Sequence, residues 1–325
     1  MKGHANHFIP FPRNKRFVGR TALLDRLRQM LFTEDDVQQV ALVGLGGMGK
    51  TQVALYLAHW VKENQPGYSV FWMPAFSIAS FEQACSKLVQ LLDIRIPNQT
   101  DAKEAVQQYL DSEKAGRWFL IIDNLDDMDT IRGQTREARG VFDFLPQSGQ
   151  GRVLITTRSH EVACTASEAT EVELLGMNHD EAIELLVESL KSKDQLENER
   201  AAAIDLLTKL ANLPLAIAQA AAYMNVNRMS IPEYLRIFDN TDQDMTELLS
   251  KKLLDRTHHH ESQGAVASTW ILSFDQIRRT SKPAADLLAF IAYIEPKAIP
   301  RASFHRLKQS NKWQKPSGRS VDTDS

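Results

Sequence analysis

The chain has 325 residues, of which 43% are hydrophobic and 24% are charged, a composition typical of a folded globular protein and not of a disordered chain. Its 38 Lys and Arg and 41 Asp and Glu give a formal net charge of −3. The chain therefore has no overall positive charge that would attract nucleic acid, although its composition does not exclude a local basic patch. Two cysteines exclude a disulfide scaffold, and no apolar run reaches the roughly 20 residues of a membrane helix. We therefore expect a cytoplasmic protein without membrane contact.

The first half of the chain has the pattern of an alternating α/β domain. Residues 1–16 are polar and contain two prolines, and we interpret them as a linker. An apolar strand is then predicted between Val37 and the glycines that begin at Gly44, further strands at residues 68–73, 118–122, 152–156 and 171–175, and helices at residues 50–63, 81–92 and 102–110. Continuous apolar strands alternating with helices indicate a parallel sheet that is covered on both faces. We predict one such domain over residues 17–175.

After residue 175 the pattern becomes helical, and we predict a helical domain over residues 176–255. Asn178 is followed three residues later by Glu181, as in a capping box that starts a helix. Pro214 fits the first turn of another helix, where its missing amide hydrogen costs nothing. Residues 266–300 are again helical and apolar, and the polar composition of residues 306–325 predicts a disordered tail.

The segment GLGGMGKT matches G-x-x-x-x-G-K-[ST] and lies between a predicted strand and a predicted helix, as a phosphate-binding loop requires. Lys50 of this loop would reach the β- and γ-phosphates, and the Thr51 hydroxyl would bind Mg²⁺. At the positive end of the following helix, glycines let consecutive amides turn towards phosphate oxygens; they are Gly44, Gly46, Gly47 and Gly49.

Acidic and basic residues follow two of the other predicted strands. Asp123 ends the strand FLIID at the edge where ligands bind in α/β sheets, and we predict that it completes the magnesium site. Asp126 and Asp127 could each orient a water, but we interpret both as solvated turn residues. Arg158 ends another strand and could contact a γ-phosphate. Because the chain has no N-K-x-D segment for guanine, we expect an adenine nucleotide.

Five segments in order make the chain similar to the NB-ARC ATPases, members of the STAND class of signal-transducing P-loop NTPases, over about residues 8–300. It is most similar to the fungal members. The segments are Phe17-Val-Gly-Arg20, the phosphate loop, the strand that ends at Asp123, Leu154-Ile-Thr-Thr-Arg158 and Asn212-Leu-Pro-Leu-Ala216. The resemblance implies the P-loop NTPase fold, followed by a helical domain and a partial winged-helix domain at residues 262–305.

The resemblance also implies roles for individual residues. Val18 and Arg20 would contact the adenine or ribose, Pro214 would pack on the adenine, and Arg158 would sense the γ-phosphate. Together with Asp123, Arg158 would then belong to the catalytic set of an ATPase.

The chain departs from the family pattern in three places. Asn124 replaces a second acid that activates water, and because an amide cannot accept a proton at neutral pH, we expect slow or absent hydrolysis. Asn212 replaces a glycine, which should be tolerated because Asn caps helices well. A later His that would hold the ADP β-phosphate has no counterpart, and His305 is no convincing substitute. We expect a truncated product or an incomplete gene model, without the sensor and effector domains of the family.

These observations predict a regulatory switch module that binds ADP or ATP with Mg²⁺. Its expected partners are the adenine nucleotide, a second copy of the chain, and sensor or effector domains outside this chain. Three alternatives stay open: an ordinary Mg²⁺-dependent ATPase with steady turnover, a DNA-binding winged-helix regulator, and a fragment that folds poorly. The acidic balance makes nucleic acid the less favoured partner, and Asn124 disfavours steady turnover.

Overall fold

The computed structural model describes residues 5–34, 38–96, 100–133, 139–166, 169–191, 199–250 and 260–293. It divides into two units, residues 1–275 and residues 276–325. The first unit contains an α/β part and a helical part that follows it in the chain. The second unit is described below by itself.

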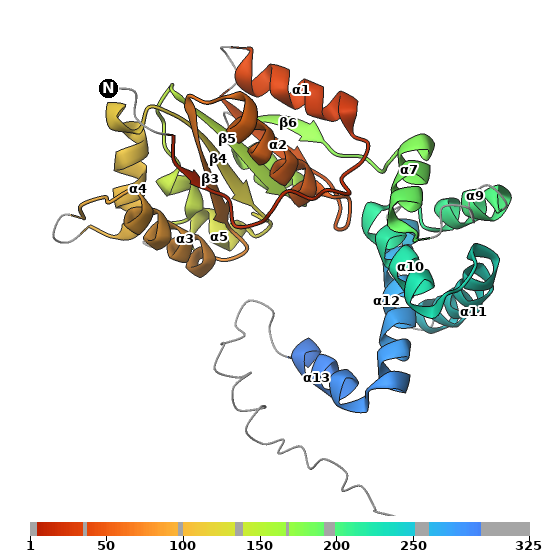
Figure 1. Ribbon diagram of the computed structural model, residues 1–325. Coiled ribbons are helices and arrows are strands. Elements are labelled where there is room, and N and C mark those ends of the chain that lie inside the picture. The colour runs from red at the N-terminus through yellow and green to blue at the C-terminus, as the bar shows by residue number, and fades with distance from the viewer. Residues whose placement is uncertain are drawn as a thin grey trace, which may run out of the picture. The chain divides into compact units, whose positions relative to one another are not determined.

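Among the described residues, six strands form one parallel sheet in the order β1-β3-β4-β5-β2-β6 (Figure 1). The strands are β1 (His7–Phe8), β2 (Gln39–Val43), β3 (Tyr68–Pro74), β4 (Arg117–Asp123), β5 (Gly151–Thr157) and β6 (Ala169–Glu173). The predicted parallel sheet is confirmed. Its last strand begins two residues earlier than the pattern indicated.

The strand β1 lies in the segment that we interpreted as a linker. His7–Phe8 pairs with β3, and the amide of Asn6 donates to the Ser69 hydroxyl at 3.1 Å. The ring of Phe11 meets Trp72 edge-on, with the centroids 6.2 Å apart. This segment is therefore held on the sheet over part of its length. A two-residue strand has no periodicity, so the sequence pattern could not reveal it.

Helices cover both faces of the sheet, as predicted (Figure 1). One face carries α1 (Thr21–Phe32) and α2 (Lys50–Asn64), and the other carries α3 (Ile78–Leu91), α4 (Ala102–Asp111), α5 (Met128–Arg132) and α6 (His160–Thr165). Side chains of β3 alternate between the two cores: Val70 and Trp72 pack with α1 and α2, and Phe71 and Met73 pack with α3 and α4. Both faces are thus dry, which accounts for the nearly continuous apolar strands.

The strand order decides which loops meet at the carboxyl edge of the sheet. β5 lies between β2 and β4, with Val43 of β2 opposite Thr157 and Ile122 of β4 opposite Ile155. Because all the strands are parallel, the loops that leave these three strands emerge side by side. The phosphate-loop motif, Asp123 and Arg158 therefore meet at one edge.

The helical part of the first unit has a core of its own. It contains α7 (His179–Ser189), α9 (Arg200–Lys209), α10 (Pro214–Asn227), α11 (Ile231–Ser250) and part of α12 (His260–Thr280). The predicted capping box is confirmed, since the Asn178 side chain accepts from the amide of Glu181 at 2.9 Å and the Glu181 carboxylate accepts from the amide of Asn178 at 3.1 Å. Pro214 occupies the first turn of α10, also as predicted.

The first part of helix α12 packs on the helical part. The Thr269 hydroxyl donates to the Gln219 side chain of α10 at 2.6 Å, and Leu272 is buried in the core of the helical part. In the second unit the described residues are the end of α12 and α13 (Lys282–Tyr293). Residues 294–305 and the tail at 306–325 lie outside the described residues, so the winged-helix and disorder predictions stay predictions.

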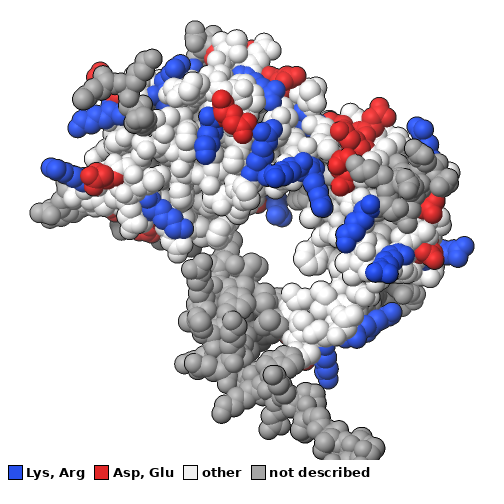
Figure 2. All heavy atoms as spheres, in the orientation of Figure 1, with Lys and Arg blue, Asp and Glu red and all other residues white. Residues whose placement is uncertain are grey.

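Surface charge and helix composition are the features of the described residues that concern nucleic-acid binding and membrane insertion. On the face drawn in Figure 2, basic and acidic side chains lie next to one another. Among the described helices, none combines the length and apolar character that crossing a membrane requires.

Candidate functional site

The loop between β2 and α2 has a backbone that favours glycine at two positions. Gly47 has φ 83° and Gly49, the N-cap of α2, has φ 92°, both in the left-handed region where a side chain would be strained. No described group accepts a hydrogen bond from the amides of residues 45–49. Free amides at the start of a helix are the usual donors for an anion. This loop therefore has the chemistry of a phosphate site.

Lys50 is buried at the first turn of α2, with 6% of its surface exposed. Its ammonium donates to the carbonyl of Gly44 at 2.5 Å and to that of Leu45 at 3.0 Å, so it bends back over the loop. Burial lowers the pKa of Lys50 to about 8 from 10.5, and the guanidinium of Arg158 adds to this, whereas the Asp126 carboxylate acts against it. The loop thus holds a cation that has few anionic neighbours.

Asp123 lies at the end of β4 beside the loop. Its Oδ1 accepts from the Thr51 hydroxyl at 3.0 Å and from the Thr156 hydroxyl at 2.7 Å. Burial raises the pKa of this carboxyl group, while the two hydroxyl hydrogen bonds lower it. The hydroxyl of Thr51 and the carboxylate of Asp123 are the hard oxygen ligands that Mg²⁺ prefers.

Thr156 also links Asn124, the residue that follows Asp123, to the Asp123 carboxylate. The amide of Asn124 donates to the Thr156 hydroxyl at 2.9 Å, and that hydroxyl donates to Asp123. Asn124 itself has φ 60°, a conformation that Asn tolerates better than most residues. Asn124 also lines the cavity described below.

Asp126 is not a solvated turn residue, contrary to our interpretation. Its Oδ2 lies 3.2 Å from Nε of Arg158, and its Oδ1 accepts from the backbone amide of Arg158 at 2.7 Å. The guanidinium also lies against the phosphate loop, because a Cβ placed on Gly46 would be 3.3 Å from Nη1 of Arg158. No local pattern predicts this pair, since the two residues are 32 positions apart in the chain.

The segment Phe17 to Arg20 is fixed against the helical part by Glu181. The amide of Arg20 donates to Oε1 of Glu181 at 2.5 Å, and the buried guanidinium of Arg20 donates to the carbonyls of Gly176 at 3.1 Å and Met48 at 3.4 Å. Gly19, with φ 68°, passes so close that a Cβ would lie 2.9 Å from Cγ of Glu181. Glu181 therefore serves both as the cap of α7 and as the anchor of this segment.

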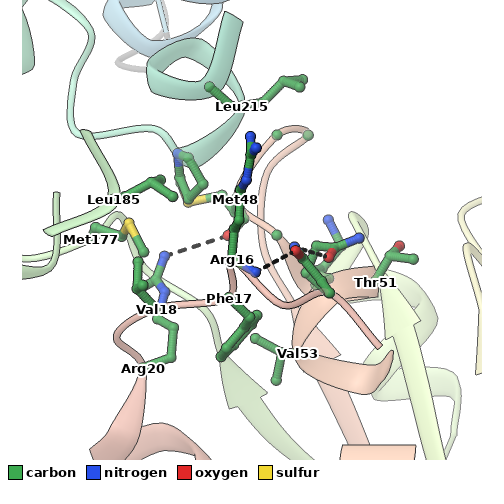
Figure 3. Close-up of a pocket in the computed structure, with 18 of the residues that line it drawn as sticks. Arg16, Phe17, Val18, Arg20, Met48, Thr51, Val53, Met177, Leu185 and Leu215 are labelled. Carbon is green, nitrogen blue, oxygen red and sulfur yellow. Dashed lines mark hydrogen bonds between the residues drawn. The ribbon is translucent and has the colours of Figure 1, made fainter. Parts of the chain in front are cut away.

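These elements enclose a cavity of about 500 Å³. The α/β part contributes the phosphate loop and residues 16–20, and the helical part contributes Met177, Leu185, Pro214, Leu215 and Ala218. Figure 3 shows Met177, Leu185 and Leu215 on the side of the helical part, with Phe17 and Val53 across from them and Thr51 further along the loop. The amide of Leu215 donates to the carbonyl of Gly47 at 3.2 Å, so α10 touches the loop directly.

The structure brings the predicted site residues to this cavity with two exceptions. Gly44 and Asp123 do not line it: Gly44 packs on Leu174, and Asp123 lies behind Thr51. The residues that line the cavity are Val18, Arg20, Gly46, Gly47, Gly49, Lys50, Thr51, Arg158 and Pro214. Their roles towards a nucleotide stay predictions.

Sequence reasoning missed further residues of the wall, among them Arg16, Met48, Met177 and Leu185. Met48 occupies a variable position of the phosphate-loop motif, whereas Met177 and Leu185 follow no motif, because their place depends on how the helical part packs. Arg16 directly precedes the Phe17-to-Arg20 segment, which was the one available signal.

Asn212 is tolerated for a different reason from the one we expected. The N-cap of α10 is Leu213, and Asn212 stands before it with φ 50°, in the left-handed region. Its carbonyl accepts from the amide of Met177 at 3.3 Å. Asn is among the few residues that adopt this conformation at low cost, which explains why it can stand in for a glycine.

In a comparison with protein-family models, the chain matches the NB-ARC domain over residues 20–195. This match covers more than half of the chain and includes the phosphate loop, Asp123, Arg158 and the capping box of α7. The chain belongs to the NB-ARC family. The NB-ARC domain thus begins at Arg20 and includes the elements from α1 to α7.

Two curated relatives of this NB-ARC chain are longer than the chain itself. A nucleotide-binding leucine-rich repeat (NLR)-like protein of Hyaloscypha variabilis is 35% identical, over 91% of this chain and 31% of its own length. The regulatory protein AfsR of Streptomyces griseus is 27% identical, over 65% of this chain and 21% of its own length. The chain thus spans less than a third of these relatives.

Among solved structures, a Signal Transduction ATPase with Numerous Domains (STAND) protein with a tetratricopeptide repeat sensor, from Pyrococcus horikoshii, is similar. It is 22% identical, with a TM-score of 0.43, over 64% of this chain and 30% of that chain.

Proposed function

We propose that the chain binds ADP or ATP with Mg²⁺ in the cavity between its α/β part and its helical part, and that it serves as the nucleotide-dependent switch of a longer signalling protein. The observation that carries this proposal is the composition of the cavity wall. One end has free loop amides, Lys50 and Thr51, and the other end has apolar side chains such as Met177 and Pro214. A nucleotide has the same two ends, an anionic phosphate chain and a flat apolar base.

The donor set at the loop fits a magnesium nucleotide. Thr51 and Asp123 would hold the ion with oxygen ligands, and phosphate oxygens and water would complete its coordination, as is common for Mg²⁺. When bound, the ion would neutralise phosphate charge. The chain's own residues supply the remaining contacts: the loop amides and Lys50 bind the phosphates, and residues 17–20 with Pro214 enclose the base.

The switch role is supported by the two-sided wall of the cavity. Because both parts of the first unit line it, a nucleotide would contact both at once, and a state that binds ADP and ATP differently would change their packing. The names of the relatives, a nucleotide-binding leucine-rich repeat (NLR)-like protein and a regulatory protein, fit such a role. Association with a second copy, or with sensor and effector domains, is part of the same proposal.

The alternative, an ATPase with steady turnover, is disfavoured by Asn124. Its amide cannot take a proton from water. The carboxylate of Asp123 is hydrogen-bonded by two hydroxyls. We expect phosphate release well below the ~1–10³ s⁻¹ of typical enzymes.

The pH dependence of nucleotide binding should report on Lys50. The pKa of this group is lowered to about 8 in the free protein, and phosphates would favour its charged form. Affinity for Mg·ADP should therefore be level up to about pH 8 and fall about tenfold per pH unit above it, because binding then requires uptake of a proton. Isothermal titration from pH 7 to pH 9.5 measures this slope.

The same shift has a consequence for stability with its own sign. Between the folded pKa of about 8 and the ordinary 10.5, the unfolded chain holds the Lys50 proton more tightly, so the nucleotide-free protein gains stability as pH rises in this window.

The control for the pH dependence of binding is the variant Lys50→Arg. Its guanidinium stays charged throughout, so the affinity that this variant retains for Mg·ADP should not decline above pH 8. An equal decline in both proteins would contradict this assignment.

Calorimetric titration of the purified chain with Mg·ADP, Mg·ATP and Mg·GDP tests the proposed function. We expect saturable binding of both adenine nucleotides and weaker binding of Mg·GDP. Phosphate release, measured on the same sample with ATP, distinguishes the switch from the ATPase. Absence of binding by either adenine nucleotide would refute the proposal.

A further inference from the structure

Arg158 is held in place by Asp126 at the side of the phosphate loop. The Asp126 carboxylate accepts a hydrogen bond from the backbone amide of Arg158 at 2.7 Å and forms an ion pair with its Nε at 3.2 Å. The guanidinium lies beside Gly46 and lines the cavity. The Arg158 side chain is 61% exposed, so no neighbouring group among the described residues prevents the guanidinium from turning towards the cavity.

Asp126 itself is fixed by the fold. It follows Leu125, which is fully buried and whose amide donates to the carbonyl of Thr156 in β5 at 3.0 Å. Arg158 is two residues further along the chain from Thr156, so the Leu125 hydrogen bond joins the loop after β4 to the end of β5 next to the ion pair. A carboxylate in this position competes for the guanidinium with any anion that arrives from the cavity.

The electrostatic environment of the loop includes both members of the pair. Asp126 favours the charged form of Lys50, and Arg158 disfavours it. The two cations and Asp126 therefore act on one another within the region where a phosphate chain would lie. A further anionic group placed there would be attracted by Arg158 and Lys50 and repelled by Asp126.

We propose that Asp126 sets the preference of this site for ADP over ATP, by retaining Arg158 and by opposing a third phosphate. The inference rests on the proposed nucleotide site. A γ-phosphate would have to draw Arg158 away from Asp126 and would meet a like charge, whereas ADP lacks the group that does either. Both contributions act in the same direction, so Asp126 is a specificity-determining residue rather than a base for hydrolysis.

The variant Asp126→Asn tests this inference, because it keeps the shape of the side chain and removes its charge. Dissociation constants are measured by calorimetry for Mg·ADP and for the magnesium complex of the β,γ-imido analogue of ATP. We expect the ratio of affinities to move about fivefold towards the ATP analogue, the size of effect that a partly exposed ion pair supports. Affinity for Mg·ADP should change less than twofold.

The matched control is Asp129→Asn, which removes an equal charge from an exposed residue of α5 three positions further on. It should leave the ratio unchanged. The thermal midpoint of each variant without nucleotide verifies that the fold is intact.

A double-mutant cycle with Arg158→Gln separates retention of Arg158 from direct repulsion. Alone, Arg158→Gln should weaken binding of the ATP analogue. In that background Asp126→Asn should change the ratio much less than in the wild type. An unchanged ratio for Asp126→Asn overturns the inference while wild-type ADP binding upholds the site. The same change with and without Arg158 overturns retention of Arg158 and assigns the preference to direct repulsion alone. Lack of binding of both nucleotides by the wild type overturns the site as well.

Discussion

Replacing Lys50 by Met should abolish most nucleotide binding, with a loss of about 100-fold in affinity for Mg·ADP. The reason is that Lys50 is the buried cation of the phosphate loop, and a charge-assisted hydrogen bond lost from a desolvated site has an effect of this size. Met retains most of the apolar stem, so the first turn of α2 stays packed. Calorimetric titration of both proteins at pH 7.5, where Lys50 is mainly charged, gives the ratio.

The matched control for this change is Lys62→Met, in the last turn of the same helix, where the side chain is exposed. It should bind Mg·ADP as the wild type does. Both variants should unfold within a few degrees of the wild type in the absence of nucleotide. Near-normal ADP binding by Lys50→Met would contradict the assignment of the loop.

Replacing Glu181 by Ala should weaken both the fold and the site, although Glu181 does not line the cavity. Its carboxylate accepts from the amide of the buried Arg20 and from the amide of Asn178 at the start of α7. The variant leaves the amide of Arg20 without its acceptor and the buried guanidinium without its nearby carboxylate. We expect a loss of about 3 kcal/mol in the free energy of unfolding, from a charged hydrogen bond and a helix cap.

The effect on the site should follow from the position of residues 17–20. When the Arg20 amide loses Glu181, residues 17–20 are held less firmly in the cavity wall, and affinity for Mg·ADP should fall about tenfold, because the segment must be ordered on binding. Urea unfolding and calorimetry measure the two effects.

Glu184→Ala, an exposed change one turn further along α7, should alter neither stability nor affinity by a comparable amount. Glu181→Gln keeps an acceptor and should fall between Ala and the wild type. If Glu181→Ala matched Glu184→Ala in both measurements, the anchor would have no function.

The sheet and the phosphate loop could be predicted from sequence because their signals are local. β2, β3, β4 and β5 are buried on both faces and show continuous apolar runs, and GLGGMGKT combines glycines, Lys50 and Thr51 in one segment. Asp123 could be linked to the loop because parallel strands end at one edge. None of these inferences required knowledge of packing between distant helices.

The contacts that complete the site could not be predicted, because they join residues far apart in the chain. Glu181 carried a clear signal as a helix cap, yet its second role depends on the close approach of Gly19. Asp126 had the composition of a surface turn, and only the order of β4 and β5 brings it to Arg158. The strand β1 has two residues, which is too few to show a hydrophobic periodicity in the sequence.

The central claim, that the loop around Lys50 and Thr51 holds an adenine nucleotide, is tested most directly by what the folded protein retains. The chain is incubated with Mg²⁺ and equal amounts of ADP and GDP and desalted. It is then denatured, and the released nucleotide is identified and counted by chromatography. The account predicts close to one ADP per chain and almost none from Lys50→Met. No retained ADP, or equal retention by the wild type and Lys50→Met, would contradict it.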